Sequence, residues 1–102
     1  MNANLHMAAR IATLLAEWKP RSILQVGVAS GILGAMCREV LEFQAGRFQR
    51  KTWTLQLDGL TWPADERTPL LNSVYSQVST WGPERSSRLR NYDVTICIDP
   101  TK

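Results

Sequence analysis

The fold of this chain is decided by one stretch, Ser22-Ile23-Leu24-Gln25-Val26-Gly27-Val28-Ala29-Ser30-Gly31. It is a short apolar run that breaks at small residues, which is typical of a buried strand followed by a tight turn. After it, apolar residues recur at helical spacing, at positions 32, 33, 36, 40 and 41. The stretch therefore predicts a strand over 22–27, a turn over 27–31 and a helix that ends near Ala45-Gly46, where glycine supplies the backbone freedom of a helix end.

The segments on either side continue the alternation of helix and strand. Upstream, five apolar residues predict one stripe of a helix over 5–18 that Pro20 stops: Met7, Ile11, Leu14, Leu15 and Trp18. Downstream, a polar loop over 47–51 leads to a second strand over 52–58, which Gly59 closes. The rest of the chain predicts a short helix over 64–72 with Pro69 near its start, a third strand over 74–80 and a fourth over 92–98.

Strands that alternate with helices predict an α/β fold with an open, mostly parallel sheet, because parallel neighbours need crossover connections. Residues 1–20 then form an N-terminal helix, and residues 21–102 form the sheet with its flanking helices. In such sheets ligands bind outside the carboxyl ends of the strands. The fourth strand ends close to Lys102, and an unpaired apolar edge is a hazard that proteins usually cover. We therefore expect a fold truncated after the fourth strand, or a partner chain that covers the exposed sheet edge.

Length and composition limit what this chain can be. Its 102 residues, 44% of them hydrophobic, allow one domain with a modest core. No window approaches the about 20 apolar residues of a membrane-spanning helix, and the first residues lack the pattern of a secretory signal, so we expect a cytoplasmic chain without a membrane partner. The net charge of +3 is scattered along the sequence. Without a binding motif or interleaved aromatic residues, it does not indicate a nucleic-acid partner.

The sequence offers little for metal or triad chemistry. Cys37 and Cys97 lie in apolar runs without metal-ligand spacing, and we interpret both as buried free thiols. The single histidine, His6, lies near the start of the chain. These residues predict neither a metal site nor a histidine-based catalytic triad.

Chemistry is instead expected at the glycine-rich turn. Gly27, Ala29 and Gly31 leave room for a ligand to approach the backbone, and the amide groups at the start of the next helix face it. The turn therefore predicts a nucleotide-type cradle. A tight strand-to-helix turn without a ligand also needs glycines, so the turn alone leaves both interpretations open.

Short motifs follow the turn along the chain. They are Gly34 with Arg38-Glu39-Val40-Leu41, Asp58-Gly59-Leu60, Val74-Tyr75, and Tyr92-Asp93-Val94 with Ile98-Asp99. With the turn, which is similar to the pattern acidic-x-Gly-x-Gly/Ala-x-Gly, they resemble class I S-adenosylmethionine-dependent methyltransferases over residues 23–102. The resemblance implies a Rossmann-like methyltransferase domain, or the N-terminal part of one, with strand order 3-2-1-4. It also implies S-adenosylmethionine as the cofactor and leaves the methyl acceptor unidentified.

The resemblance implies roles for residues of the cofactor site. Gly27, Ala29 and Gly31 would line the methionine portion of the cofactor, and Asp99 would face the cofactor or the substrate.

Three positions depart from the family pattern. Gln25 stands where an acid usually orients the amino group of the cofactor. Thr61 occupies the position where the family has its ribose-binding acid. Asp58 is nearby but an odd number of positions away, so its side chain points to the opposite face of the sheet from Thr61 if the strand continues. Trp81-Gly82 replaces an acid near the adenine. Each lost charged hydrogen bond costs about 1.5–3 kcal/mol, so these departures predict weakened cofactor binding.

Two alternatives to a methyltransferase remain open. The departures and the exposed edge also fit a degenerate, non-catalytic methyltransferase-like domain that serves as an interaction module. A nicotinamide-dinucleotide site is the other alternative, because residues 29–34 nearly satisfy Gly-x-Gly-x-x-Gly and Asp58 would end the second strand as a ribose-binding acid.

Two polar pairs are given structural interpretations. Arg38-Glu39 is expected on a solvated helix face, with Glu42 one turn beyond Arg38 in an i,i+4 contact. Tyr92-Asp93 is expected to open a strand, with the tyrosine packed and the aspartate near the turn.

Overall fold

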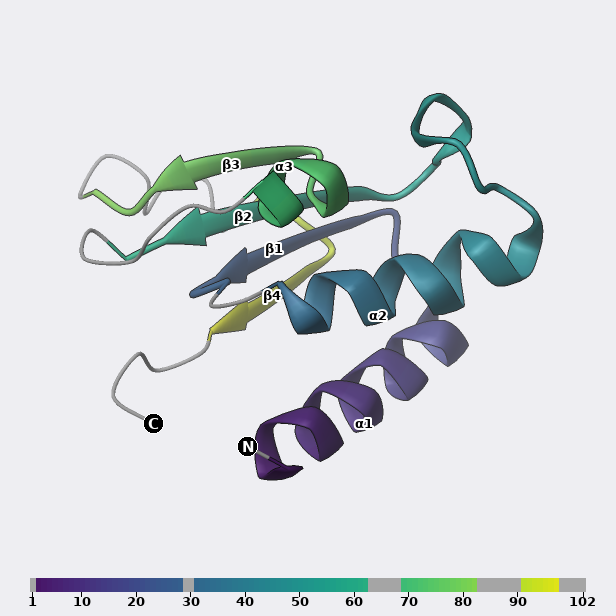
Figure 1. Ribbon diagram of the computed structural model, residues 1–102, viewed down its shortest axis with the longest axis horizontal. Coiled ribbons are helices and arrows are strands. Elements are labelled where there is room, and N and C mark those ends of the chain that lie inside the picture. Colours follow the sequence, from purple (N-terminus) through teal and green to yellow (C-terminus); the bar gives the residue numbers. More distant parts are fainter. Residues whose placement is uncertain (1, 29–30, 63–68, 83–90, 98–102) are drawn as a thin grey trace.

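The described residues form a sheet of four parallel strands in the order β3-β2-β1-β4. The computed structural model describes residues 2–28, 31–62, 69–82 and 91–97. The strands are β1 (Ser22–Val26), β2 (Gln56–Thr61), β3 (Gln77–Thr80) and β4 (Val94–Cys97). Each neighbouring pair is parallel. The chain therefore has the predicted open, Rossmann-like α/β fold (Figure 1).

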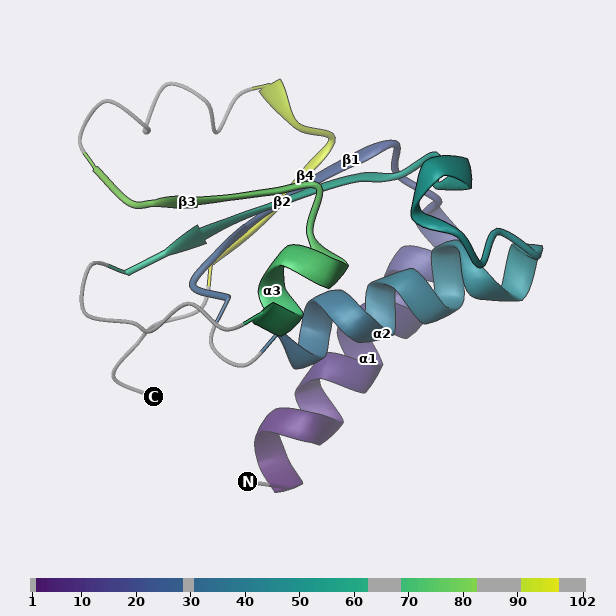
Figure 2. The ribbon, with the colours of Figure 1, turned by 45° about the horizontal axis from the view of Figure 1, so that its top comes forward.

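The α-helices of the described residues all lie on one face of this sheet (Figures 1 and 2). They are α1 (Asn2–Trp18), α2 (Ile32–Leu41) and α3 (Pro69–Val74), with short 3-10 turns η1 (Phe43–Ala45) and η2 (Arg50–Thr52) between α2 and β2. Proline has no backbone N–H to lose at a first helical position, which explains the start of α3. Within the same residues, the opposite face of the sheet carries no helix.

The core is divided by the sheet into two clusters. On the helix side, fully buried Ile23 and Leu57 pack with residues of all three helices. On the open side, Leu24, Val26 and Leu60 form a smaller cluster, against which two tryptophans and a tyrosine pack. Successive strand residues point to opposite faces, so the buried apolar residues of β1 supply both clusters.

Three predicted strand boundaries were wrong. β2 begins at Gln56 and not at Thr52, which lies in η2. β2 does not close at Gly59 but runs through it to Thr61. A Cβ at Gly59 would lie 2.5 Å from Cγ1 of Val28, so this glycine is needed for packing and does not end the strand. The third strand begins at Gln77, because Val74 ends α3. β4 falls inside the predicted 92–98 segment, and Ile98 lies outside the described residues.

The buried face of α1 also differs from the predicted stripe. Ala8, Ala12 and Leu15 are buried, whereas Met7 and Trp18 are exposed and Leu14 is exposed with them. Small alanine side chains allow the helices to approach closely, and α1 packs closely against α2. No helix in the described ranges combines the length and apolarity needed to cross a membrane.

A buried ion cluster joins α2 to the amino-terminal edge of the sheet. The Arg38 guanidinium donates to the carbonyls of Val74 (2.7 Å) and Leu55 (2.8 Å) and lies 3.3 Å from the Glu42 carboxylate. Glu42 also accepts from the Leu55 N–H (2.8 Å) and from Arg47 (2.6 Å). The predicted contact from Arg38 to Glu42 is confirmed.

The predicted solvated face at Arg38-Glu39 was half wrong. Glu39 is exposed, whereas Arg38 is 1% and Glu42 0% exposed. Arg38 turns inward because the carbonyls at the start of β2 and the end of α3 need donors there. Since the amino ends of the strands lie opposite the ligand-binding edge, we interpret this cluster as structural.

Candidate functional site

The candidate site lies at the carboxyl ends of the strands, which share one edge of the sheet (Figure 1). The chain passes from β1 outward to β2 and β3 and then returns to β4 on the other side of β1. The strand order therefore changes direction between β1 and β4. In open α/β sheets, ligands bind at this switch point.

The turn after β1 is the predicted cradle, and the structure describes its residues 27, 28 and 31. Gly27 (φ 88°) and Gly31 (φ 89°) take left-handed conformations, which residues other than glycine rarely adopt. The Gly27 N–H donates to the Leu60 carbonyl (2.8 Å), and the Gly31 N–H donates to the Val28 carbonyl (2.9 Å). Gly31 is the N-cap residue of α2, and as a glycine it has no side chain that could cap the first amides of the helix. Ala29 lies outside the described residues.

Gln25 is buried on the helix side of β1, and both of its polar atoms are engaged. Its Oε1 accepts from the Tyr75 hydroxyl (2.6 Å), and its Nε2 donates to the Gly27 carbonyl (3.1 Å). Burial raises the pKa of Tyr75, which keeps the phenol protonated as the donor. The Gln25 amide therefore connects the cradle to Tyr75, fifty positions later in the sequence.

The Tyr75 ring lies against two glycines. A Cβ on Gly34 would lie 2.5 Å from the ring Cζ, and one on Gly59 would lie 3.2 Å from its Cδ1. The Gly34 and Gly59 of the sequence motifs therefore have a packing role, because they make room for this ring.

The ends of β2 and β3 carry an aromatic pair where the resemblance places acids. Thr61 is the last residue of β2, and its hydroxyl donates to the Ser79 carbonyl at 3.4 Å. The Trp81 N–H donates to the Thr61 carbonyl (2.8 Å). The rings of Trp62 and Trp81 lie 5.9 Å apart and are tilted by 54°. The sequence analysis missed this pair: Trp81 directly follows the predicted third strand, but Trp62 follows the end of the second strand only because β2 continues to Thr61.

Asp58 lies away from this edge, on the open face of the sheet. Because β2 continues to Thr61, the two side chains point to opposite faces, as the odd spacing predicted. Asp58 Oδ2 accepts from Gln56 (3.1 Å) and from the Tyr92 hydroxyl of the segment before β4. Its Oδ1 is the one buried side-chain polar atom of the described residues without a hydrogen-bond partner.

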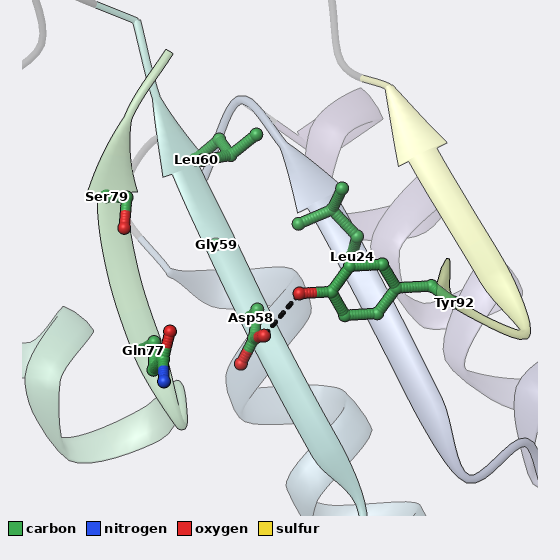
Figure 3. A pocket seen from close by; sticks show the side chains of 7 residues that line it. All are labelled: Leu24, Asp58, Gly59, Leu60, Gln77, Ser79 and Tyr92. Carbon is green, nitrogen blue, oxygen red and sulfur yellow. Dashed lines mark hydrogen bonds between the residues drawn. The ribbon is translucent and has the colours of Figure 1, made fainter. Parts of the chain in front are cut away.

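A shallow hollow surrounds Asp58 (Figure 3). Its cavity volume is about 10 Å³, and Gln77 and Ser79 of β3 line its far side. Ligand pockets start at about 300 Å³, whereas this hollow has room for about one water molecule, so it does not hold a nucleotide. The packed Tyr92 confirms the structural interpretation of that residue, and the Asp93 carboxylate accepts from the Arg21 N–H at 2.9 Å.

The structure thus brings some of the expected site residues together and separates others. Gln25, Gly27, Gly31 and Thr61 lie at or beside the carboxyl edge, while Asp58 does not. Asp99 falls outside the described residues. Within the described residues, no group of three histidine, cysteine or acidic side chains could hold a metal ion.

Comparison of the chain with protein-family models, with curated proteins and with solved structures finds no match.

Proposed function

We propose that this chain binds S-adenosylmethionine at the carboxyl edge of its sheet and is a domain, or part of a domain, of the methyltransferase type. The observation that carries the proposal is the left-handed cradle of Gly27 and Gly31 between β1 and α2, at the switch point of a parallel β3-β2-β1-β4 sheet. The motif resemblance along residues 23–102 supports the same cofactor.

The edge residues suggest how the cofactor would be held. The cradle backbone and the start of α2 suit the polar methionine portion, because helix amides attract a carboxylate. In this proposal the Thr61 hydroxyl and the Trp62–Trp81 pair would lie toward the ribose and the adenine. Aromatic rings stack on a nucleobase without needing an acid, and such stacking is worth about 1–3 kcal/mol per base.

The chemistry would then be methyl transfer. S-adenosylmethionine, when bound, supplies an activated methyl group. The part of the chain is to position the cofactor for in-line attack by an acceptor, and positioning supplies much of the rate in reactions of this kind. No described residue is assigned as a catalytic acid or base, and the acceptor is not identified.

A non-catalytic module is the second candidate, and Gln25 favours it. Its amide is occupied by Tyr75 and Gly27, so it contacts its own chain where the family's acid contacts the cofactor. The nicotinamide alternative loses support at Asp58, which lies three positions before the end of β2 and bonds to Tyr92.

Calorimetric titration of the purified chain with S-adenosylhomocysteine tests the proposal. We expect binding with a dissociation constant in the micromolar range, on the order of 1–100 µM, because the charged contacts are reduced. NAD serves as a parallel titrant, and far-UV circular dichroism confirms that the sample is folded. No binding by a folded sample rejects the proposal and favours the non-catalytic module, and binding of NAD alone favours the dinucleotide site.

Two glycine variants show whether the cradle is the binding site. Gly31→Ala and Gly46→Ala each place an L side chain at a left-handed φ, 89° and 85° respectively. Both should lose about 1 kcal/mol of stability. Only Gly31→Ala should lose affinity for S-adenosylhomocysteine, by roughly tenfold or more, because Gly46 lies after η1 with open space around it. Equal affinities of the two variants would place the ligand elsewhere.

A further inference from the structure

Four large apolar side chains lie in a line along α1, and three of them are exposed. Met7 is 48%, Leu14 64% and Trp18 74% exposed, and Ile11 between them is partly buried. These four residues, here called the α1 seam, follow each other at intervals of four, three and four positions. That interval pattern is the one by which two helices pack side by side.

The seam lies beside the face that α1 uses within its own domain. Ala8, Ala12 and Leu15 are buried in the helix layer, about 100° around the helix from the seam. α1 is the outermost helix of the layer, with α2 between it and α3 (Figures 1 and 2). A second helix can therefore reach the seam without displacing α1 from its own domain.

The seam is flanked by one basic and one acidic side chain. Arg10 and Glu17 are both exposed, and they lie on the same side of the seam because they are seven positions apart. No described residue forms an ion pair with either side chain. In a packed helix pair, charges at such flanking positions select the partner and its direction.

We infer that the α1 seam binds a second copy of this chain as an antiparallel, two-fold symmetric helix pair. With the two-fold axis midway between positions 12 and 13, Met7 faces the partner's Trp18 and Ile11 faces the partner's Leu14. The same arrangement brings Arg10 beside the partner's Glu17, and two-fold symmetry repeats each contact. In a parallel two-fold pair, the flanking charges of the two copies would lie on opposite sides of the interface, which would leave both Arg10 and Glu17 unpaired.

The size of the surface sets the expected affinity. The seam spans about 16 Å of helix, at about 1.5 Å per residue. An interface of this length is below the standard size of stable complexes, which places it among weak and transient ones. We expect a dissociation constant on the order of 10 µM to 1 mM.

Sedimentation velocity of the whole chain over about 5 µM to 1 mM tests the inference. The sedimentation coefficient should rise from the monomer toward the dimer value. Leu14→Glu should weaken association by roughly tenfold or more, whereas Ala9→Glu should not, because Ala9 is exposed on the same helix outside the seam. Both positions face solvent, so neither variant should unfold, which circular dichroism checks.

Charge exchange tests the antiparallel direction. Arg10→Glu and Glu17→Arg should each self-associate more weakly than the wild type, since like charges then meet across the pair. An equimolar mixture of the two variants should associate at least as well as the wild type, because both cross-pairs become opposite in sign. A chain that stays monomeric throughout rejects the inference and leaves the seam to another protein or a lipid surface. Association that Leu14→Glu does not weaken, or a mixture no tighter than its components, also rejects it.

Discussion

Gln25 lies in β1, close to the point where the strand enters the candidate cradle. Its amide accepts a hydrogen bond from the Tyr75 hydroxyl and donates one to the Gly27 carbonyl. A carboxylate has no donor for the second bond, so the amide is suited to this position in a way that an acid is not. The departure from the family pattern at Gln25 thus has a structural reason within this chain.

Gln25→Glu should destabilise the fold in a pH-dependent way. A carboxylate at position 25 would face the Gly27 carbonyl in a buried site, which raises the pKa of the new carboxyl above its ordinary value of about 4.3. The protonated form of this carboxyl can donate to Gly27 as the amide does. The free energy of unfolding relative to the wild type should therefore be nearly unchanged at pH 4 and lower by about 2–3 kcal/mol at pH 7.5.

Urea unfolding at the two pH values measures this difference. Gln44→Glu is the matched control, because Gln44 is exposed in η1 and should show little change at either pH. A Gln25→Glu chain as stable as the wild type at pH 7.5 would contradict the arrangement of Gln25 between Tyr75 and Gly27.

At the scale of the elements, local signals set the boundaries that could be predicted. α1 and β1 follow the prediction closely, because Pro20 stops the first helix. The predicted end of α2 near Ala45-Gly46 was wrong: α2 ends at Leu41, and Gly46 (φ 85°) ends the 3-10 turn η1 that follows it. β2 and β3 were misplaced because their decisive contacts are distant in sequence. Gly59 sits within β2 to accommodate Val28 and Tyr75, and no window around it carries that information.

The features of the candidate site also divide into those that local sequence determines and those that depend on contacts between distant residues. The positive φ angles of Gly27 and Gly31 follow from their residue type and the strand-to-helix turn. The Tyr75 partner of Gln25 and the Trp62–Trp81 pair depend on which strands become neighbours. The sequence analysis predicted the glycine-rich turn but not the contacts that support it.

Glu42→Gln should lower the free energy of unfolding, because it weakens the ion cluster that connects α2 to the start of β2. Burial acts to raise the pKa of Glu42, but hydrogen bonds from Arg47 and from the backbone of Leu55 outweigh it and hold the pKa below its ordinary value. The ion cluster therefore stabilises the fold above the unfolded-state pKa of about 4.3 and loses this contribution as pH falls through the lower, folded-state value. At pH 7 the variant should lose about 3 kcal/mol, because Arg38 stays buried without its partner.

Chemical unfolding at pH 7 and at pH 3 measures that loss. The difference between Glu42→Gln and the wild type should narrow at the lower pH. Glu39→Gln, one helical turn earlier and exposed, should cost less than about 0.5 kcal/mol at both values. A constant difference between Glu42→Gln and the wild type would show that the carboxylate charge does not stabilise the cluster.

At the scale of the whole molecule, the described helices cover one face of the sheet and leave the other to side chains (Figure 2). The residues of β4 alternate between the covered and the uncovered face: Val94 and Ile96 pack on the helix side, while Thr95 and Cys97 are exposed. The prediction of two buried thiols was therefore right for Cys37 and wrong for Cys97. Two surfaces are thus available to a partner chain, the edge and open face of β4 and the α1 seam.

The two cysteines can tell these surfaces apart. Burial raises the pKa of Cys37 to about 11, although Arg38 acts against it, so its reactive thiolate is scarce at pH 8. A chromogenic disulfide reagent should modify Cys97 rapidly and Cys37 at least about 100-fold more slowly, in step with unfolding. The Cys97→Ser variant assigns the fast phase, which it should abolish.

Association through the α1 seam leaves Cys97 on the far face of the sheet, so the modification rate of Cys97 should be the same below and above the dimerisation midpoint. Protection of Cys97 at high concentration would instead mean that copies pair along β4, and Leu14→Glu would then fail to restore its reactivity.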